Sequence, residues 1–382
     1  MRYTIGQLAE IIDGDRGKNY PKQDEFYPQG YCLFLNTGNV TKEGLIFEEN
    51  QFIMKEKDEA LRKGKLKRGD IVYTTRGTVG NAGYYNSNVP YENVRINSGM
   101  VILRANGEIV DARFLYQILK SEYYRPYFKQ YCTGSAQPQL PIKNFSQIYL
   151  NVPDIKTQHR IADILSAYDN LIENNQKQIK LLEEAAQRLY KEWFVDLRFP
   201  GHENTKIVDG VPEGWSRGLL KELISVNYGK DHKKAPDDGN IPVYGSGGLM
   251  RKCNKSLFSG EAVLIPRKGS LNNIMYVDET FWTVDTMFYA TMKQPHTAVF
   301  LYFFVKAFDM YSMNIGAAVP SMTAKILDAM DVVIPDKETL EKFDKLTKTY
   351  FNKIKTLQGQ NERLKIARDL LLAKLMSGEV EV

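Results

Sequence analysis

Two long stretches of the chain carry hydrophobic residues at alternating steps of four and three. The first reaches from Ile161 to Trp193, the second begins at Phe343, and each follows shortly after a Pro-Asp pair. Such a heptad seam is typical of a helix that packs along another helix. The pattern predicts a central helix over residues 156–196 and a distal helix over residues 338–379.

The two seams match when the helices pair antiparallel within one chain. In that register every layer joins an a position to a d position, and an asparagine meets an asparagine. The register residues are Asn175 with Asn361, Ile172 with Leu364, and Leu182 with Ile354. Because a slip would leave buried amides unpaired, the asparagine layer predicts one fixed register. A coil formed between two chains remains an alternative.

The regions that precede the two helices resemble each other. Residues 134–140 reappear in altered form as residues 316–322, and Pro153 recurs 182 positions later as Pro335. A glycine-flanked skeleton in each region also aligns Arg76 with Arg267. A duplicated unit of this length indicates two equivalent modules.

Each repeat mixes strand-like runs of β-branched and aromatic residues with short helical segments. This mixture predicts an α+β protein in which two mixed α/β modules are separated by the antiparallel coil and related by a pseudo-two-fold axis. We place the modules at residues 1–155 and 215–337, with a polar linker at residues 197–214.

Composition narrows the class of protein. The chain has 382 residues, 43% of them hydrophobic, and a formal net charge of +5. Its three cysteines are scattered and odd in number, which argues against a disulfide framework. The N-terminus has no apolar signal region, and no apolar run is long enough to span a bilayer. We therefore expect a soluble cytoplasmic protein without a membrane partner.

Motifs for catalysis are missing. The sequence has no GxxxxGK[ST] phosphate loop, no GxGxxG fingerprint, no HExxH and no CxxC. It also lacks the Asn-Pro-Pro-Tyr type of motif found in methyltransferases that bind a flipped adenine. Pro153-Asp154-Ile155-Lys156 imitates part of a nuclease motif but has no second carboxylate beside it. The sequence predicts no catalytic residue, no metal site and no cofactor held by this chain.

Basic residues interleaved with small polar residues and tyrosines favour recognition of DNA, since such side chains donate to phosphates and to base edges. A solvated surface is the alternative for any one cluster. The candidate contacts in the first module are Lys18, Asn19, Tyr20, Arg76, Thr78, Asn81, Arg95 and Gln137. Those in the second are Lys230, His232, Lys233, Tyr244, Ser246, Arg251, Arg267, Lys268, Ser270 and Asn272.

Several motifs resemble those of one known family. They are Val211-Pro-Glu-Gly-Trp215, Ile241-Pro-Val-Tyr-Gly-Ser-Gly-Gly248, Pro153 with Gln158 and Ile161, Tyr190-Lys-Glu-Trp-Phe-Val195, and Leu371-Leu-Ala-Lys-Leu-Met-Ser-Gly-Glu379. The chain resembles the specificity (S) subunits of type I restriction-modification systems over nearly its whole length. The second repeat departs from the pattern, because its segment Pro335-Asp-Lys-Glu-Thr339 is not followed by the glutamine.

The resemblance implies a DNA-reading subunit without catalysis of its own. Two target-recognition domains would each read one half of a split site in double-stranded DNA, and the helices would dock two methyltransferase subunits. Those partners would bind S-adenosylmethionine and methylate adenine, and restriction subunits, where present, would use ATP and Mg²⁺. The coil would set the half-site separation near one DNA turn, roughly 34 Å.

Because the two modules differ in their loops, we expect an asymmetric, bipartite target read by a monomeric adaptor. Two other classes stay open: a self-contained DNA modification enzyme, and a coiled-coil scaffold whose modules bind protein rather than DNA.

Overall fold

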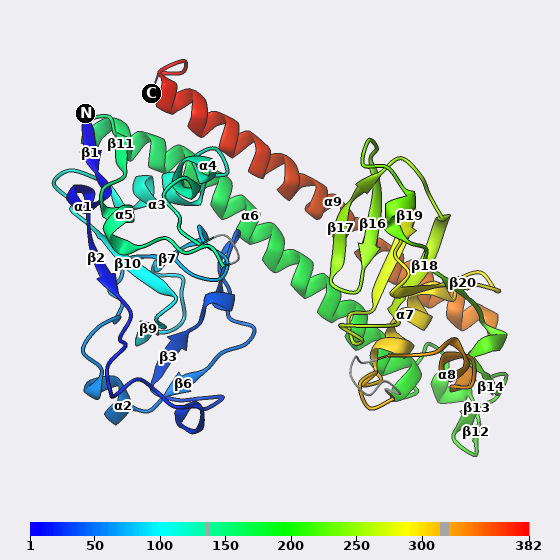
Figure 1. Cartoon of the computed structure of the whole chain (residues 1–382). Helices are drawn as coiled ribbons and strands as arrows, with labels where there is room; N and C mark the ends of the chain where they lie inside the picture. The colour runs from blue at the N-terminus through cyan, green and yellow to red at the C-terminus, as the bar shows by residue number, and fades with distance from the viewer. Residues whose placement is uncertain (135–136, 314–320, 382) are drawn as a thin grey trace. The chain divides into compact units, whose positions relative to one another are not determined.

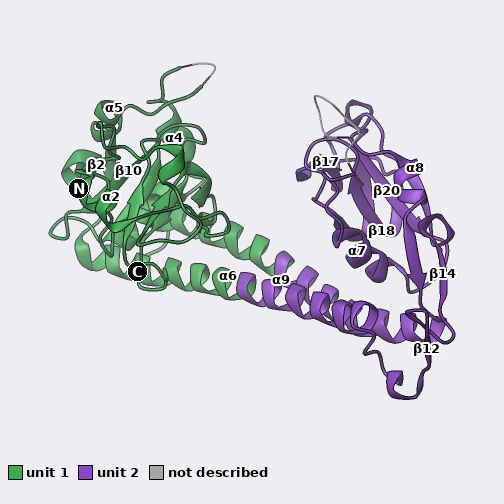
Figure 2. Cartoon of the chain, turned by 90° about the horizontal axis from the view of Figure 1, so that it is seen from below, with its two compact units in different colours: residues 1–175, 359–382 green, residues 176–358 purple. Residues whose placement is uncertain are grey.

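The computed structural model describes residues 1–134, 137–313 and 321–381. It divides into two compact units, Met1–Asn175 with Gly359–Val382, and Gln176–Gln358 (Figure 2). Parts of the repeated segments at residues 134–140 and 316–322 lie outside the described residues. Both units combine mixed sheets with short helices, which confirms the α+β class expected from the sequence.

Unit 1 is built on a four-stranded antiparallel sheet in the order β2-β10-β7-β8. Its strands are β2 (Ala9–Asp13), β10 (Met100–Ala105), β7 (Ile71–Thr74) and β8 (Ala82–Tyr84). A second sheet has the order β6 (Phe52–Ile53), β3 (Cys32–Leu35) and β9 (Val94–Ile96), and two short pairs are β1 (Arg2–Thr4) with β11 (Tyr149–Asn151) and β4 (Val40–Thr41) with β5 (Gly44–Leu45). Its short helices are α1 (Ile5–Leu8), α2 (Lys55–Ala60), α3 (Ala112–Lys120), α4 (Arg125–Lys129) and α5 (Ile142–Ser146).

Unit 2 is built on a six-stranded sheet in the order β15-β20-β18-β19-β16-β17. These strands are β15 (Ile224–Tyr228), β20 (Met287–Met292), β18 (Phe258–Pro266), β19 (Met275–Thr283), β16 (Ile241–Gly245) and β17 (Gly248–Cys253). Two short pairs are β12 (Ile207–Val208) with β13 (Val211–Pro212) and β14 (Ser216–Leu219) with β21 (Asp331–Ile334), and the short helices are α7 (Ala298–Lys306) and α8 (Ala324–Asp328). The first of these hairpins lies in the segment that the sequence assigns to a linker.

Two long helices, α6 (Ile155–Tyr190) and α9 (Lys337–Ser377), stand out in Figure 1, and each contributes residues to both units (Figure 2). A π-helical turn at Lys191–Val195 follows α6. Both helices begin two residues after the proline of the repeated Pro-Asp pair. Asp154 Oδ1 accepts from Thr157 N at 3.1 Å, and Asp336 Oδ1 accepts from Thr339 N at 2.9 Å. The same N-cap therefore starts each helix.

Gln158, which the second repeat replaces with Leu340, is fully buried beside the start of α3. Its Oε1 accepts from Asp111 N at 3.0 Å, and its Nε2 donates to Ile109 O and Pro153 O. The glutamine thus ties the start of α6 to the start of α3, and its role here is structural.

The asparagine layer of the coil lies within unit 1. Asn175 Nδ2 donates to Asn361 Oδ1 at 2.9 Å, and both side chains are buried. Of the flanking register residues, Ile172 and Ile354 are buried while Leu182 and Leu364 are half-buried. At the other end of α6, Trp193 packs on Phe343 with 5.8 Å between ring centroids. α9 runs helically through Gly359.

Replacing Asn175 alone with leucine should destabilise the chain by about 1–3 kcal/mol, because the buried Asn361 amide then has no partner. The double variant N175L/N361L should recover or exceed wild-type stability, since both polar groups are gone. Urea unfolding of the wild type, both single variants and the double variant measures this. A single variant as stable as the wild type would contradict the buried amide pair.

Candidate nucleic-acid interface

In unit 1, an ionised aspartate holds the loop at residues 14–20 against the basic loop at residues 62–68. Asp15 Oδ1 accepts from Gly17 N and Asp15 Oδ2 accepts from Arg62 N, both at 2.7 Å. Burial favours the neutral carboxyl, but these backbone donors hold the pKa of Asp15 below its usual value. The exposed side chains of Lys18 and Arg62 are thereby presented on neighbouring loops.

A third and a fourth loop join this surface. Arg16 Nη2 donates to Ser98 O at 3.2 Å, and the next carbonyl, Gly99 O, accepts from Thr75 N at 2.9 Å and from Arg76 N at 3.1 Å. Residues 97–99 therefore connect the loop that carries Arg16 to the β7–β8 loop that carries Arg76. We name Arg16, Lys18, Arg62 and Arg76, all exposed, the unit 1 basic cluster.

Unit 2 repeats the same backbone arrangement with different side chains. Thr286 O accepts from Arg267 N at 2.9 Å and from Lys268 N at 3.2 Å. Each loop is also bonded to a later segment, through Leu140 N to Thr75 O in unit 1 and Met322 N to Arg267 O in unit 2. Thr75 thus corresponds to Arg267.

The correspondence corrects the alignment drawn from the sequence, which set Arg76 opposite Arg267. Strand pairing agrees with the correction, because Thr74 pairs with Met100 and Pro266 pairs with Met287. Arg76 is therefore equivalent to Lys268. The alignment drawn from the sequence rested on Gly69 and Gly260, but Gly69 lies five residues before Thr74 whereas Gly260 lies six residues before Pro266, so the spacing differs by one residue.

Arg267 is placed by aromatic rings. Its guanidinium carbon lies 5.3 Å from the ring centroid of Tyr228 and 5.7 Å from that of Phe288, and Nη1 donates to Asp285 O. Lys268 on the same loop is exposed. The loop is braced at its far end, where Asn272 Nδ2 donates to Asp309 Oδ1 and Asn272 Oδ1 accepts from Met310 N.

The turn between β16 and β17 contacts this loop. Ser246 O accepts from Asn273 Nδ2 at 2.9 Å, and the space beside Gly269 is filled by Ser246 Oγ. A φ of +83° at Gly269 also favours glycine there. Ser246, Arg267, Lys268 and Ser270 are therefore brought together on one part of unit 2.

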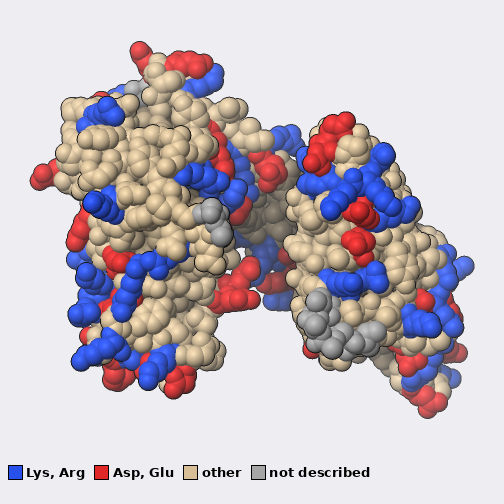
Figure 3. All heavy atoms as spheres, in the orientation of Figure 1, with Lys and Arg blue, Asp and Glu red and all other residues tan. Residues whose placement is uncertain are grey.

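Lys230, His232 and Lys233 form a separate group near the end of β17. Arg251 holds this group in place, since Nη2 donates to Ala235 O at 2.7 Å and Nη1 pairs with Asp237. The face that carries β16 and β17 shows lysines and arginines together with acidic side chains (Figure 3). Lys230 and Lys233 are exposed, whereas Arg251 braces the loop.

Two candidates of unit 1 are corrected to structural residues. Arg95 is 5% exposed; its Nε donates to Asp58 Oδ1 at 2.6 Å, and its two other nitrogens donate to the carbonyls of Lys63, Asp58 and Leu61. Asn81 is also 5% exposed and its Nδ2 donates to Val40 O at 2.9 Å. Their polar atoms are turned into the fold, so neither is offered to a ligand.

The remaining candidates fall into two groups. Some are engaged within the fold: Asn19 Nδ2 donates to Ala60 O, Tyr20 packs edge-on to Phe34, and Tyr244 Oη donates to Glu279 Oε1. Others have side chains that are exposed or half-exposed on loops, namely Thr78, Gln137, Ser270 and His232.

Sequence reasoning missed Arg16, Arg62 and Tyr228 as members of these surfaces. Arg62 belongs to a basic run that is visible in the sequence, and Arg16 stands in the turn-forming segment Asp13-Gly-Asp-Arg-Gly17. Tyr228 is 53% exposed at the end of β15. Its importance follows only from the stacked Arg267, which no spacing in the sequence indicates.

Within residues 1–134, 137–313 and 321–381, no three His, Cys, Asp or Glu side chains gather as a group that could hold a metal ion. The helices of the described chain are each too short or too polar to cross a membrane.

Comparison with known proteins gives consistent matches. A family model described as the type I restriction modification DNA specificity domain matches residues 1–184 and 212–365. The MjaIX type I restriction enzyme specificity subunit of Methanocaldococcus jannaschii is 25% identical, covering 85% of this chain and 81% of its own length. The HindI specificity subunit of Haemophilus influenzae is 24% identical, covering 98% of this chain and 100% of its own.

A solved structure shows the same fold. The crystal structure of the type I restriction-modification S subunit from M. genitalium superposes with a TM-score of 0.58 at 18% sequence identity. The match covers 98% of this chain and 95% of that one.

Proposed function

From the premise that the chain belongs to the family of type I restriction-modification DNA specificity proteins, we propose that it reads an asymmetric, bipartite site in double-stranded DNA. Unit 1 and unit 2 each supply one recognition module, and each module reads one half-site. The half-sites lie about one DNA turn, roughly 34 Å, apart.

One observation carries the proposal. The β7–β8 loop and the β18–β19 loop are held by the same double backbone hydrogen bond, to Gly99 O and to Thr286 O. The side chains on this shared frame differ, with Thr75 and Arg76 in one and Arg267 and Lys268 in the other. Equivalent frames with different donors support the reading of two different base sequences.

The chain acts as a non-catalytic adaptor in the cytoplasm. Its helices dock two methyltransferase subunits, which bind S-adenosylmethionine and methylate adenine, and restriction subunits with ATP and Mg²⁺ join where they are encoded. Two recognition modules in one chain support a monomeric adaptor within the complex. The residues proposed to face DNA are the unit 1 basic cluster, Thr78 and Gln137, and in unit 2 Lys230, His232, Lys233, Ser246, Arg267, Lys268 and Ser270.

The test is to co-express the chain with its neighbouring methyltransferase subunit in a host without other adenine methylation, and to map methylated bases by single-molecule sequencing. We expect one split motif, methylated on both strands, with different bases in its two halves. Replacing Ser246 and Lys268 with alanine should relax or abolish one half-site and leave the other unchanged, because both residues belong to unit 2.

A continuous or palindromic motif would contradict the bipartite, asymmetric reading. An assembled complex that methylates nothing and binds no DNA at low salt would favour a protein-binding scaffold. Methylation by the purified chain without its partner would show that the chain is an enzyme.

A further inference from the structure

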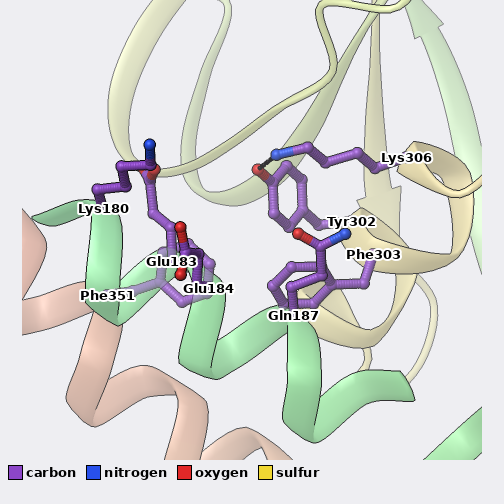
Figure 4. A pocket seen from close by; sticks show the side chains of 8 residues that line it. All are labelled: Lys180, Glu183, Glu184, Gln187, Tyr302, Phe303, Lys306 and Phe351. Atoms are coloured by element: carbon purple, nitrogen blue, oxygen red, sulfur yellow. Dashed lines mark hydrogen bonds between the residues drawn. The ribbon is translucent and has the colours of Figure 1, made fainter. Parts of the chain in front are cut away.

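A cavity of about 180 Å³ opens in unit 2 between α6, α7 and α9 (Figure 4). Tyr302 and Phe303 of α7 and Phe351 of α9 supply aromatic walls, and Glu183 and Glu184 of α6 supply carboxylates. Lys306 also lines it, with Nζ donating to Tyr302 Oη at 2.7 Å. Lys180 of α6 lines it as well, so the cavity combines ring faces with two carboxylates and two ammonium groups.

Unit 1 contains the equivalent position. α3 and α7 each have nine residues and end in a lysine, Lys120 and Lys306. The long helices correspond at a spacing of 182, so that Ile155, where α6 begins, matches Lys337, where α9 begins. The match of Lys120 with Lys306 and the spacing of 182 between the long helices identify the residues of unit 1 that correspond to those lining the cavity.

In unit 1 that place is filled by an ion cluster. Asp169 Oδ1 binds Arg368 Nη1 at 2.8 Å, and Asp169 Oδ2 binds Lys120 Nζ at 2.6 Å. Gln117 Nε2 donates to the same carboxylate, and Arg368 also pairs with Asp369. Burial favours the neutral acid, but Lys120 and Arg368 hold the pKa of Asp169 below its usual value. A guanidinium from α9 thus completes the packing of α3 on the coil.

Unit 2 lacks that guanidinium. The residue 182 positions before Arg368 is Ala186, the counterpart of Asp169 is Phe351, and the counterpart of Gln117 is Phe303. Losing the long arginine side chain leaves space, and the two phenylalanines line it. At the rim, Glu183 takes the place of Lys365. Partial burial of the Glu183 carboxyl raises its pKa. The charge of Lys306, which also lines the cavity, acts against this rise.

We propose that this cavity receives the guanidinium group of an arginine from a bound partner polypeptide, in the position that Arg368 fills in unit 1. A planar guanidinium stacks on aromatic faces and binds a carboxylate through two parallel hydrogen bonds, which suits Phe351 and Tyr302 with Glu183. A lysine ammonium offers no plane to stack, and an anion would face Glu183 and Glu184.

The inference rests on the proposed function for the partner's identity, a methyltransferase subunit docked on the helices. Its consequence is that two copies of the same partner meet unlike sites. In unit 1 the chain uses its own arginine, whereas in unit 2 the partner supplies one. The two binding events should therefore differ in affinity and respond to different substitutions.

The first experiment uses the full chain and N-acetyl-L-arginine amide as the probe, with N-acetyl-L-lysine amide as its matched control. Titration calorimetry and a crystal soak should show the arginine probe in the cavity and binding at least tenfold stronger than the lysine probe. The variant A186R/F351D, which rebuilds the ion cluster of unit 1, should lose the probe. Equal binding of both probes, or binding that survives in this variant, would overturn the assignment.

The second experiment counts methyltransferase subunits bound to the chain by native mass spectrometry during a titration. The exposed rim substitution Glu183→Arg, which supplies a guanidinium from the chain itself, should weaken one binding event at least tenfold and leave the other. Glu341→Arg makes the same charge change at an exposed position of α9 outside the cavity, and should alter neither event.

The two experiments separate the two ideas. A wild-type chain that binds the arginine probe but no methyltransferase would contradict the proposed function and keep the guanidinium site. A chain that binds two methyltransferase subunits with Glu183→Arg indistinguishable from wild type would keep the proposed function and overturn the partner's arginine.

Discussion

Replacing Arg95 with methionine should lower the free energy of unfolding by about 3–5 kcal/mol, the usual result of removing one member of a buried ion pair. Asp58 would lose the Nε donor at 2.6 Å and remain buried, with a side chain only 2% exposed. The three carbonyls that accept from Arg95 would lose their donor as well. Urea unfolding measures the change.

The matched substitution is Arg76→Met, which removes the same charge from an exposed loop. It should change stability by no more than about 0.5 kcal/mol, and it should weaken DNA binding. Arg95→Met should lower stability but leave DNA binding unchanged, provided that binding is measured with equal concentrations of folded protein. If Arg95→Met is neutral for stability and Arg76→Met is not, the structural assignment of the two arginines is reversed.

Acid should distinguish the same variants. Burial favours a neutral Asp58, but hydrogen bonds from Lys65 and Arg95 hold the pKa of its carboxyl below the usual value. The unfolded chain therefore binds the proton more readily, and the pair contributes stability at neutral pH that is lost as the pH falls through and below the ordinary aspartate range. This acid-dependent loss should be smaller in Arg95→Met, because the partner that lowers the pKa is gone.

Reversing three charges of the unit 1 basic cluster, in the variant R16E/R62E/R76E, should remove most of the DNA affinity of the chain. Each phosphate contact contributes about 0.9 to the slope of log K against log salt, so the slope should become shallower by about 3. Binding to a duplex that carries the mapped motif, measured by fluorescence anisotropy between low and physiological salt, provides the slope.

The control reverses the charges of Arg188, Lys345 and Lys353, which are also exposed but lie on α6 and α9. It changes the net charge by the same amount, so the two variants separate a local site from a general charge effect. Equal losses of slope in both variants would contradict the unit 1 basic cluster as a contact surface. Circular dichroism before each titration shows that both variants are folded.

The coiled coil could be predicted from the sequence because its hydrophobic residues recur at a regular spacing along the chain. A heptad pattern depends only on spacing, and the Asn175 and Asn361 layer followed once the helices were set antiparallel. The asparagines are hydrogen-bonded in the structure at 2.9 Å. The hydrophobic layers beside them remain a prediction as direct contacts.

The equivalence of the loop residues was harder to predict from the sequence, because it depends on how the flanking strands pair. Arg76 and Arg267 each stand seven residues after a glycine and shortly after the end of a strand, and only the pairing of Thr74 with Met100 and of Pro266 with Met287 shows the shift of one residue. Arg95 stands in β9 between Val94 and Ile96. From the sequence, a charged residue in so short a strand could contact a ligand or stabilise the fold. The structural role follows from the hydrogen bond to Asp58, which lies 37 positions away in the sequence.

The cavity of unit 2 could not be found from the sequence alone. Unit 2 has Ala186 where unit 1 has Arg368, and an alanine in a helix carries no signal of its own. Only the filled counterpart in unit 1, where Arg368 binds Asp169, shows what is missing.

The composition of unit 1 has a consequence for the synthesis of this protein. Its core includes Leu372 and Leu375 together with Phe114 and Leu165, so the last turns of α9 complete a module that the ribosome begins first. At about 5–20 residues per second, the chain between Asn175 and Gly359 takes roughly 10–40 s to emerge. Through that interval the face that α9 will cover stays open to water or to a chaperone. Residues 1–175 therefore lack part of their core until α9 has been made, and a truncation before Leu372 would remove core side chains from unit 1.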